Sequence, residues 1–298
     1  MTGFENYIGE ACALSAAIVW ALAVIFFRRS GEAVHPIGLN IFKNILAMIL
    51  LVPTAWLFGE TLLRPTPVED YLLLLLSGAL GIGIADTLFF KSLNILGAGM
   101  SAIVDLLYSP VIIGLSILWL GDQLNFWQVV GVLMILSAVS AAVGERKNNQ
   151  VDRRQMLMGV LWGALAMLSM GVGIVMVKPL LNVSPLIWAT EVRLIGGMAV
   201  LAVVLMFHPS RRAIVTSIGT RHRWGYMVTG SILGAYVSMI LWLAGMKFTQ
   251  TSIAAALNQT TNIFIFIFAA LILKERVTLI KSIAIVAGVI GALLVTFG

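Results

Sequence analysis

Apolar residues fall into ten stretches along the chain, and polar or basic positions separate each stretch from the next. A helix needs roughly 20 mostly apolar residues to cross the hydrocarbon core of a bilayer. The pattern therefore predicts ten membrane-spanning helices, over residues 8–27, 36–58, 70–90, 100–120, 125–143, 156–177, 185–207, 224–246, 250–273 and 279–298. Very little of the chain remains to form a soluble domain.

The second five stretches repeat the first five. With an offset of 153 residues, polar markers coincide: Asp105 matches Asn258, Ser109 matches Asn262, Asp122 matches Glu275 and Gln128 matches Lys281. Five spans cross the membrane an odd number of times, so the copy must be inverted, as in many secondary transporters. We predict an all-α integral membrane protein with a first repeat over 1–144, a polar connector over 145–155 and a second repeat over 156–298.

Composition and charge agree with a membrane protein. Charged residues make up 11% of the chain, against about 25% in soluble domains. Fourteen of the 19 Lys and Arg residues fall in loops on one side of the predicted membrane and three in loops on the other. The positive-inside rule then places the basic side in the cytoplasm and both chain ends outside. The basic residues are scattered without interleaved aromatic residues, so we expect no nucleic-acid partner.

The sequence has no motif that indicates catalysis. It lacks the Gly-rich phosphate loop of ATPases, so ATP cannot drive transport through this chain. His35, His208 and His222 lie in loops without metal-ligand spacing, and Cys12 is the only cysteine. We expect no enzyme activity, no cofactor and no bound metal.

Five ionisable residues lie more than one helical turn inside the predicted spans: Lys43, Asp86, Asp105, Glu191 and Arg193. Such residues are costly in a membrane and usually face protein or water. The first three lie near the basic side, and the last two lie at a similar depth from the opposite side. Two charge clusters at mirrored depths are expected of two gates, with Lys43, Asp86, Glu191 and Arg193 in gating or coupling roles. Static ion pairs and side chains that reach the interface are the alternatives.

Two spans carry matching polar stripes. Asp105, Tyr108, Ser109 and Ile112 share one helix face, and Asn258, Thr261, Asn262 and Ile265 share the equivalent face of the partner span. Lipid offers these groups no hydrogen-bond partners, so we expect the stripes to face a substrate cavity. A helix contact joined by polar residues is the alternative. Pro110 should loosen its helix one turn earlier. Trp20 and Tyr236 are candidates for stacking on the substrate, although ordinary packing would also explain them.

The chain resembles the drug/metabolite transporter superfamily in its ten-helix EamA-type form. The resemblance covers nearly the whole chain. It is carried by the small residues and Trp of the first span (Ala13 to Trp20) and by a basic residue in the second span of each half (Lys43 and Arg193). The end of each half also carries it: Ser109-Pro110 is followed by Gly121-Asp122, Gln128 and Gly131, and Lys274-Glu275 is followed by Gly288 and Gly291. The chain departs from the family pattern in having Lys43 where Arg is usual, Asp122 where Glu is usual and Ile263 where a second Pro is often found.

The resemblance implies a secondary transporter that moves a small metabolite by alternating access. The expected cargo is an amino acid or a related amphiphile, usually exported through the cell inner (plasma) membrane. Protons as a coupling ion are a separate hypothesis, which rests on the acids Asp86, Asp105 and Glu191 inside the spans. An importer or a nucleotide-sugar or metabolite exchanger is the alternative. The resemblance places both termini in the cytoplasm, opposite to the charge count. The last span of each half has a face of small residues that suits either packing within the bundle or a dimer contact, so a monomer or a homodimer is expected.

Overall fold

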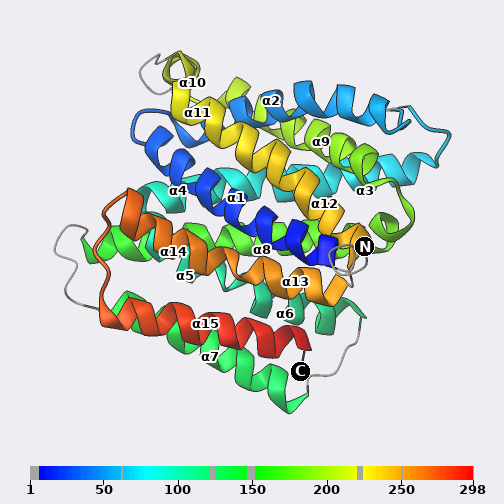
Figure 1. Ribbon diagram of the computed structural model, residues 1–298. Coiled ribbons are helices and arrows are strands. Elements are labelled where there is room, and N and C mark those ends of the chain that lie inside the picture. The colour runs from blue at the N-terminus through cyan, green and yellow to red at the C-terminus, as the bar shows by residue number, and fades with distance from the viewer. Residues whose placement is uncertain are drawn as a thin grey trace.

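Helices form most of the structure, a computed structural model that describes residues 7–61, 63–120, 125–145, 152–219, 224–249 and 251–297 (Figure 1). The first half contains α1 (Ile8–Ser30), α2 (Pro36–Leu57), α3 (Val68–Gly78), the π-helix η2 (Ala79–Ile84), α4 (Ala85–Leu96), α5 (Ala98–Asp105), α6 (Tyr108–Leu120) and α7 (Phe126–Gly144). The second half contains α8 (Arg153–Val183), α9 (Leu186–Phe207), α10 (Arg211–Ile218), α11 (Trp224–Ser231), the π-helix η4 (Ile232–Val237), α12 (Ser238–Phe248), α13 (Thr251–Gln259), α14 (Thr261–Ile272) and α15 (Leu279–Phe297).

The helices agree with the predicted spans. Within the described residues, nine helical segments are long and apolar enough to cross a membrane. The remaining span, predicted over 250–273, is divided into α13 and α14. The prediction of an all-α membrane protein with ten spans is confirmed. One segment was missed: the connection between the spans predicted over 185–207 and 224–246 contains the short helix α10, whose Ile214 packs against Ile37 and Leu201.

The two halves share one architecture in opposite orientations. Adding 153 to the bounds of α7 gives the bounds of α15, and the same offset carries η2 onto η4. Asn125 and Thr278, related by this offset, occupy equivalent positions just before α7 and α15; Asn125 accepts from Gln128 N–H and Thr278 from Lys281 N–H. In Figure 1, α1 and α8, the first helices of the two halves, run in opposite directions. The halves are therefore inverted repeats, as predicted.

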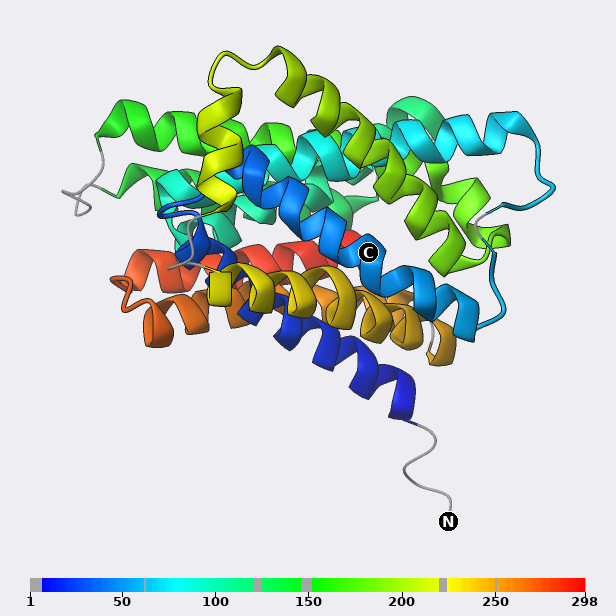
Figure 2. The ribbon, with the colours of Figure 1, turned by 90° about the horizontal axis from the view of Figure 1, so that it is seen from above.

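The repeats interlock through their first helices. α1 packs against α11, α12, α13 and α14 of the second repeat, whereas α8 packs against α3, α4 and α6 of the first. α1, α4, α9 and α14 all end toward the same end of the bundle (Figures 1 and 2). α1 begins and α15 ends toward the other end. An even number of crossings produces this arrangement.

Glycines allow two close helix crossings. A side-chain carbon at Gly131 of α7 would lie 2.5 Å from the Gly291 oxygen of α15, and one at Gly291 would lie 2.7 Å from the Gly131 oxygen. Between α3 and α9, a carbon at Gly78 would lie 1.8 Å from the Arg193 oxygen. Small residues let membrane helices approach closely. The small faces of the last span in each repeat therefore serve to pack the two repeats together.

Candidate functional site

A break divides the fourth span of each repeat at the same position. α5 ends at Asp105 and α6 begins at Tyr108, while α13 ends at Gln259 and α14 begins at Thr261. Pro110 explains the first break, because it cannot donate to the carbonyl four residues earlier and its ring clashes there. The second break has no proline. There, the Thr260 hydroxyl and N–H both donate to the Leu257 carbonyl.

Polar side chains surround the two breaks and meet across them. The Gln259 amide donates to the Ser109 hydroxyl at 3.2 Å, which joins the two fourth spans. Ser109 and Asn262 are buried, whereas Asp105 and Tyr108 are half-buried and Asn258 is exposed. Broken helices in transporters commonly mark the substrate site, because the interrupted backbone is tolerated only where it lines a cavity or is buried in protein.

A buried ion pair joins the second and third spans of the first repeat. Lys43 of α2 pairs with Asp86 of α4, and their side chains are 6% and 12% exposed. One turn away from Lys43, the Asn40 amide donates to the carbonyls of Ile82 and Gly83 and to the Thr87 hydroxyl. These contacts hold α2 against the π-helix η2, where the wider backbone turn leaves carbonyls available to side chains.

Arg193 and Glu191 do not form the paired cluster expected from the sequence. Arg193 lies against η2, with its Nη2 atom 3.3 Å from where a side-chain carbon at Gly81 would be. Glu191 is 2% exposed, and neither of its carboxyl oxygens has a hydrogen-bond partner in the described part of the chain. Residues two apart on a helix point about 200° from each other, so the two charges lie on different faces of α9.

The two aromatic candidates pack on neighbouring helices. Trp20 is half-buried and meets Phe27 of its own helix edge to face, with ring centroids 6.5 Å apart. Tyr236 lies in η4, and its hydroxyl is 2.9 Å from the Thr54 hydroxyl of α2. Both π-helices are thus tied to α2 by side-chain hydrogen bonds, through Asn40 at η2 and Thr54 at η4. Sequence reasoning missed Asn40, Thr54 and Gln259, because a lone amide or hydroxyl in an apolar span gives no distinctive pattern.

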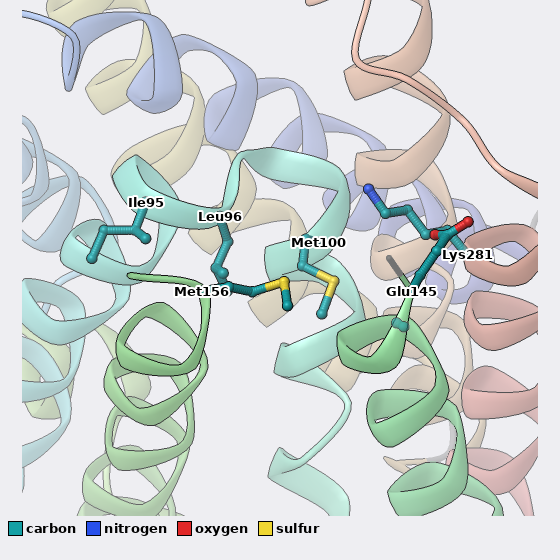
Figure 3. Close-up of a pocket in the computed structure, with 7 residues that line it drawn as sticks. Ile95, Leu96, Met100, Glu145, Met156 and Lys281 are labelled. Carbon is teal, nitrogen blue, oxygen red and sulfur yellow. The ribbon is translucent and has the colours of Figure 1, made fainter. Parts of the chain in front are cut away.

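A small pocket lies away from the breaks, where several helices begin or end. Figure 3 shows its lining residues: Ile95, Leu96, Met100, Ala142, Glu145, Met156 and Lys281. Glu145, the residue after α7, accepts from the Thr278 hydroxyl at 2.7 Å. Nearby, Glu275 accepts from the N–H groups of Ala98 and Gly99 at 2.8 and 2.9 Å, at the start of α5. Asp122, matched with Glu275 in the sequence, lies outside the described residues.

The fold and its interrupted polar helices define a multi-pass membrane transporter. The family model of the EamA-like transporter family matches residues 7–143 and 157–297. The chain belongs to this family, and hence to the drug/metabolite transporter type. An uncharacterized transporter of Archaeoglobus fulgidus is 23% identical over 283 residues, which are 93% of this chain and 92% of that protein. A crystal structure with 19% identity, covering 97% of this chain and 95% of its own, superposes with a TM-score of 0.66 and shares the fold.

Family membership confirms the predicted resemblance. It implies a small-molecule cargo and a bilayer as the protein's surroundings. The described helices and the family match agree on the two-repeat architecture.

Proposed function

We propose that the protein exports a small metabolite, an amino acid or a related amphiphile, across the cell inner membrane by alternating access. The observation that carries this proposal is the pair of breaks at equivalent positions in the two repeats, bridged by Gln259 and Ser109. A symmetric pair of interrupted helices gives a site that can face either side. The direction rests on the resemblance to exporters of this family.

The substrate site we propose lies between the breaks. Asp105, Tyr108 and Ser109 would contact the cargo from the first repeat, and Asn258 and Asn262 from the second. Trp20 and Tyr236 would supply aromatic walls from the flanking helices. The units over 1–144 and 156–298, joined by 145–155, would move against each other around this site.

Two further groups are proposed to control the exchange. The Lys43–Asp86 pair would act as a gate, because α2 and α4 cannot separate without breaking it. Glu191 would carry a proton in this conformation, since an ionised carboxylate without partners is very costly at such burial. Its release when α9 is hydrated would couple transport to protons.

Transport into proteoliposomes tests the proposal. We expect wild-type protein and the control Ser137→Ala, on an exposed position of α7, to move amino acids, and Asp105→Asn and Asn262→Ala to move them much more slowly. Equal rates in all four proteins would contradict the assigned site. Faster transport with the same compound trapped on the far side would favour an exchanger over an exporter.

Glu191→Gln separates coupling from binding. We expect this variant to bind cargo but to lose acceleration by an imposed pH gradient. An undiminished response to the gradient would rule out Glu191 as the proton carrier.

A further inference from the structure

A carboxylate of the second repeat holds the start of a helix of the first repeat. Both oxygens of Glu275 are used: one accepts from the Ala98 N–H at 2.8 Å and the other from the Gly99 N–H at 2.9 Å. Glu275 lies in the connection between α14 and α15, and Ala98 is the first residue of α5. The contact therefore joins the two broken spans at the end of the bundle where α4 and α14 end (Figure 1).

The two helix halves that Glu275 joins also pack against each other. α5 packs against α14, and a side-chain carbon at Gly99 would lie 3.5 Å from the Phe266 ring and 3.8 Å from the Ala269 side chain. The other two halves have different main neighbours, since α6 packs against α8 and α13 packs against α1. The contact of α5 with α14 thus separates the breaks from the Glu275 end.

The backbone before Glu275 is strained. Lys274 has a φ of 55°, in the left-handed region that residues other than glycine rarely adopt. The turn ends α14, because the Glu275 N–H donates to the Ala269 carbonyl at 3.1 Å, and it brings the Glu275 carboxylate to α5. Strained residues persist where the surrounding structure holds them, and they cluster at functional sites and switch regions.

Gly97, the residue between α4 and α5, forms a hinge opposite the carboxylate. Its φ is 80°, and a side-chain carbon there would lie 2.7 Å from the Glu275 Oε1 atom. Glycine allows both this backbone conformation and the close approach. Hinges are a few residues at the ends of elements that absorb large changes of φ and ψ. A rotation at Gly97 would carry α5 away from Glu275 while α4 stays in place.

From these contacts we infer that Glu275 is the latch of a gate: its two hydrogen bonds hold α5 against α14, and their release, with rotation at Gly97, opens a path from this end of the bundle to the breaks. Water can replace the carboxylate at the two N–H groups once the helices part, so release leaves no buried donor unpaired. The inference rests on the proposed function, because alternating access requires a gate that opens and closes. The latch acts between the repeats, whereas the Lys43–Asp86 pair lies within the first repeat.

The first test locks the gate with a disulfide. In a Cys12→Ser background, Gly99→Cys and Ala269→Cys have side-chain carbons 3.8 Å apart, which suits a disulfide. The twenty L-amino acids are the transport probes in proteoliposomes. We expect the oxidised pair to transport no faster than empty liposomes, and reduction to restore transport. Undiminished transport by the fully cross-linked protein would overturn the inference, because a cap that only stabilises α5 has no need to open.

Ala138→Cys with Gly288→Cys is the matched control. These positions join α7 to α15 across the repeats, and their side-chain carbons lie 3.7 Å apart. We expect equal transport by the oxidised and reduced forms of this control, since it lies outside the broken spans. Comparing two forms of one protein cancels any effect of the substitutions themselves. Loss of transport in both cross-linked proteins would overturn the assignment of the gate to α5 and α14.

The second test needs no cargo. Ala269→Cys in the Cys12→Ser background is buried against Gly99, so a water-soluble thiol reagent reaches it when α5 leaves α14. We expect Glu275→Gln, which keeps the shape of the side chain but loses one acceptor and the charge, to speed this labelling several-fold. Glu145→Gln is the control, because Glu145 also bonds across the repeats, to the Thr278 hydroxyl. Equal labelling with and without Glu275→Gln would overturn the latch.

The two tests separate failure of the latch from failure of the proposed function. If wild type moves none of the amino acids, the proposed cargo is wrong, and labelling alone decides whether Glu275 is a latch. Labelling also decides if the reduced cysteine pair is inactive. Transport that continues through the cross-linked gate leaves the transporter and its site at the breaks, and removes only the role of Glu275.

Discussion

Lys43 and Asp86 form a buried ion pair that joins α2 to α4 beside the π-helix η2. Arg193 of α9 also lies against η2, with its Nη2 atom 3.3 Å from where a side-chain carbon at Gly81 would be. Removing one member of a buried pair leaves the other uncompensated, at a cost of about 3–5 kcal/mol. Replacing both members with apolar residues of similar volume is often neutral.

These energies predict different results for single and double variants. Lys43→Met and Asp86→Asn should each lower the stability by about 3 kcal/mol or more, whereas Lys43→Met combined with Asp86→Leu should recover most of it. Denaturant unfolding in detergent measures the three variants. If the double variant also transports at the wild-type rate, the pair has no part in gating.

The reciprocal glycine contact between α7 and α15 predicts a packing defect. Gly131→Ala or Gly291→Ala places a methyl carbon 2.5 or 2.7 Å from an opposing backbone oxygen, and such overpacking costs about 1–3 kcal/mol. Gly144→Ala, on the same helix with nothing within 4 Å, is the control and should change stability by less than about 0.5 kcal/mol. Unfolding temperatures compare the three; equal values would mean that the helices separate at no cost.

The hydrogen bonds of Glu275 predict that its loss would loosen the start of α5. Its carboxylate accepts from two N–H groups at the start of that helix, where the helix itself offers no acceptor. Loss of such a cap costs about 0.5–2 kcal/mol. Glu275→Ala should therefore speed amide hydrogen exchange over 98–105, with a smaller effect for Glu275→Gln, which keeps an acceptor. Arg276→Ala, an exposed neighbour, is the control. Unchanged exchange in Glu275→Ala would show that the cap contributes nothing.

The environment of His35 predicts how the stability of the protein changes with pH. Burial, followed by the neighbouring His208 and Lys91, lowers the pKa of His35 from its ordinary value of 6.5. A group whose pKa is lowered on folding contributes stability above its ordinary pKa, and that stability is lost as the pH falls below it. The unfolding temperature should thus fall between pH 7.5 and pH 5.5.

The matched variant is His35→Asn, which keeps an acceptor for the Ile37 N–H but cannot titrate. Its decrease over the same pH interval should be smaller than that of wild type. An equal decrease would assign the pH effect to other groups.

The spans were predictable from the sequence because a bilayer demands a long apolar segment wherever the chain crosses it. The break at Pro110 was predictable for a similar reason, since a missing N–H leaves its mark in the sequence. The break at Thr260 was not, because a threonine in an apolar helix usually bonds within an intact turn. The offset of 153 residues between the repeats was predictable from the polar markers. The same offset relates the ends of α7 to those of α15.

The charges of the site were only partly predictable. Depth alone grouped Glu191 with Arg193, although their positions on the helix turn them apart. The Lys43–Asp86 contact depends on how α2 and α4 pack, and the engagement of the η2 carbonyls depends on a π-turn that has no sequence signature. Hydropathy sets which residues are inside the membrane; the packing of particular helices decides which of them meet.

The matched π-helices also bear on the origin of the chain. π-helices hold well under 1% of residues in proteins, yet η2 and η4 are separated by the repeat offset itself. Separate acquisition of both at one equivalent position would be a rare coincidence. The wide turn is most simply older than the duplication that gave the chain its two repeats, so it belongs to the five-helix unit itself and not to either copy alone.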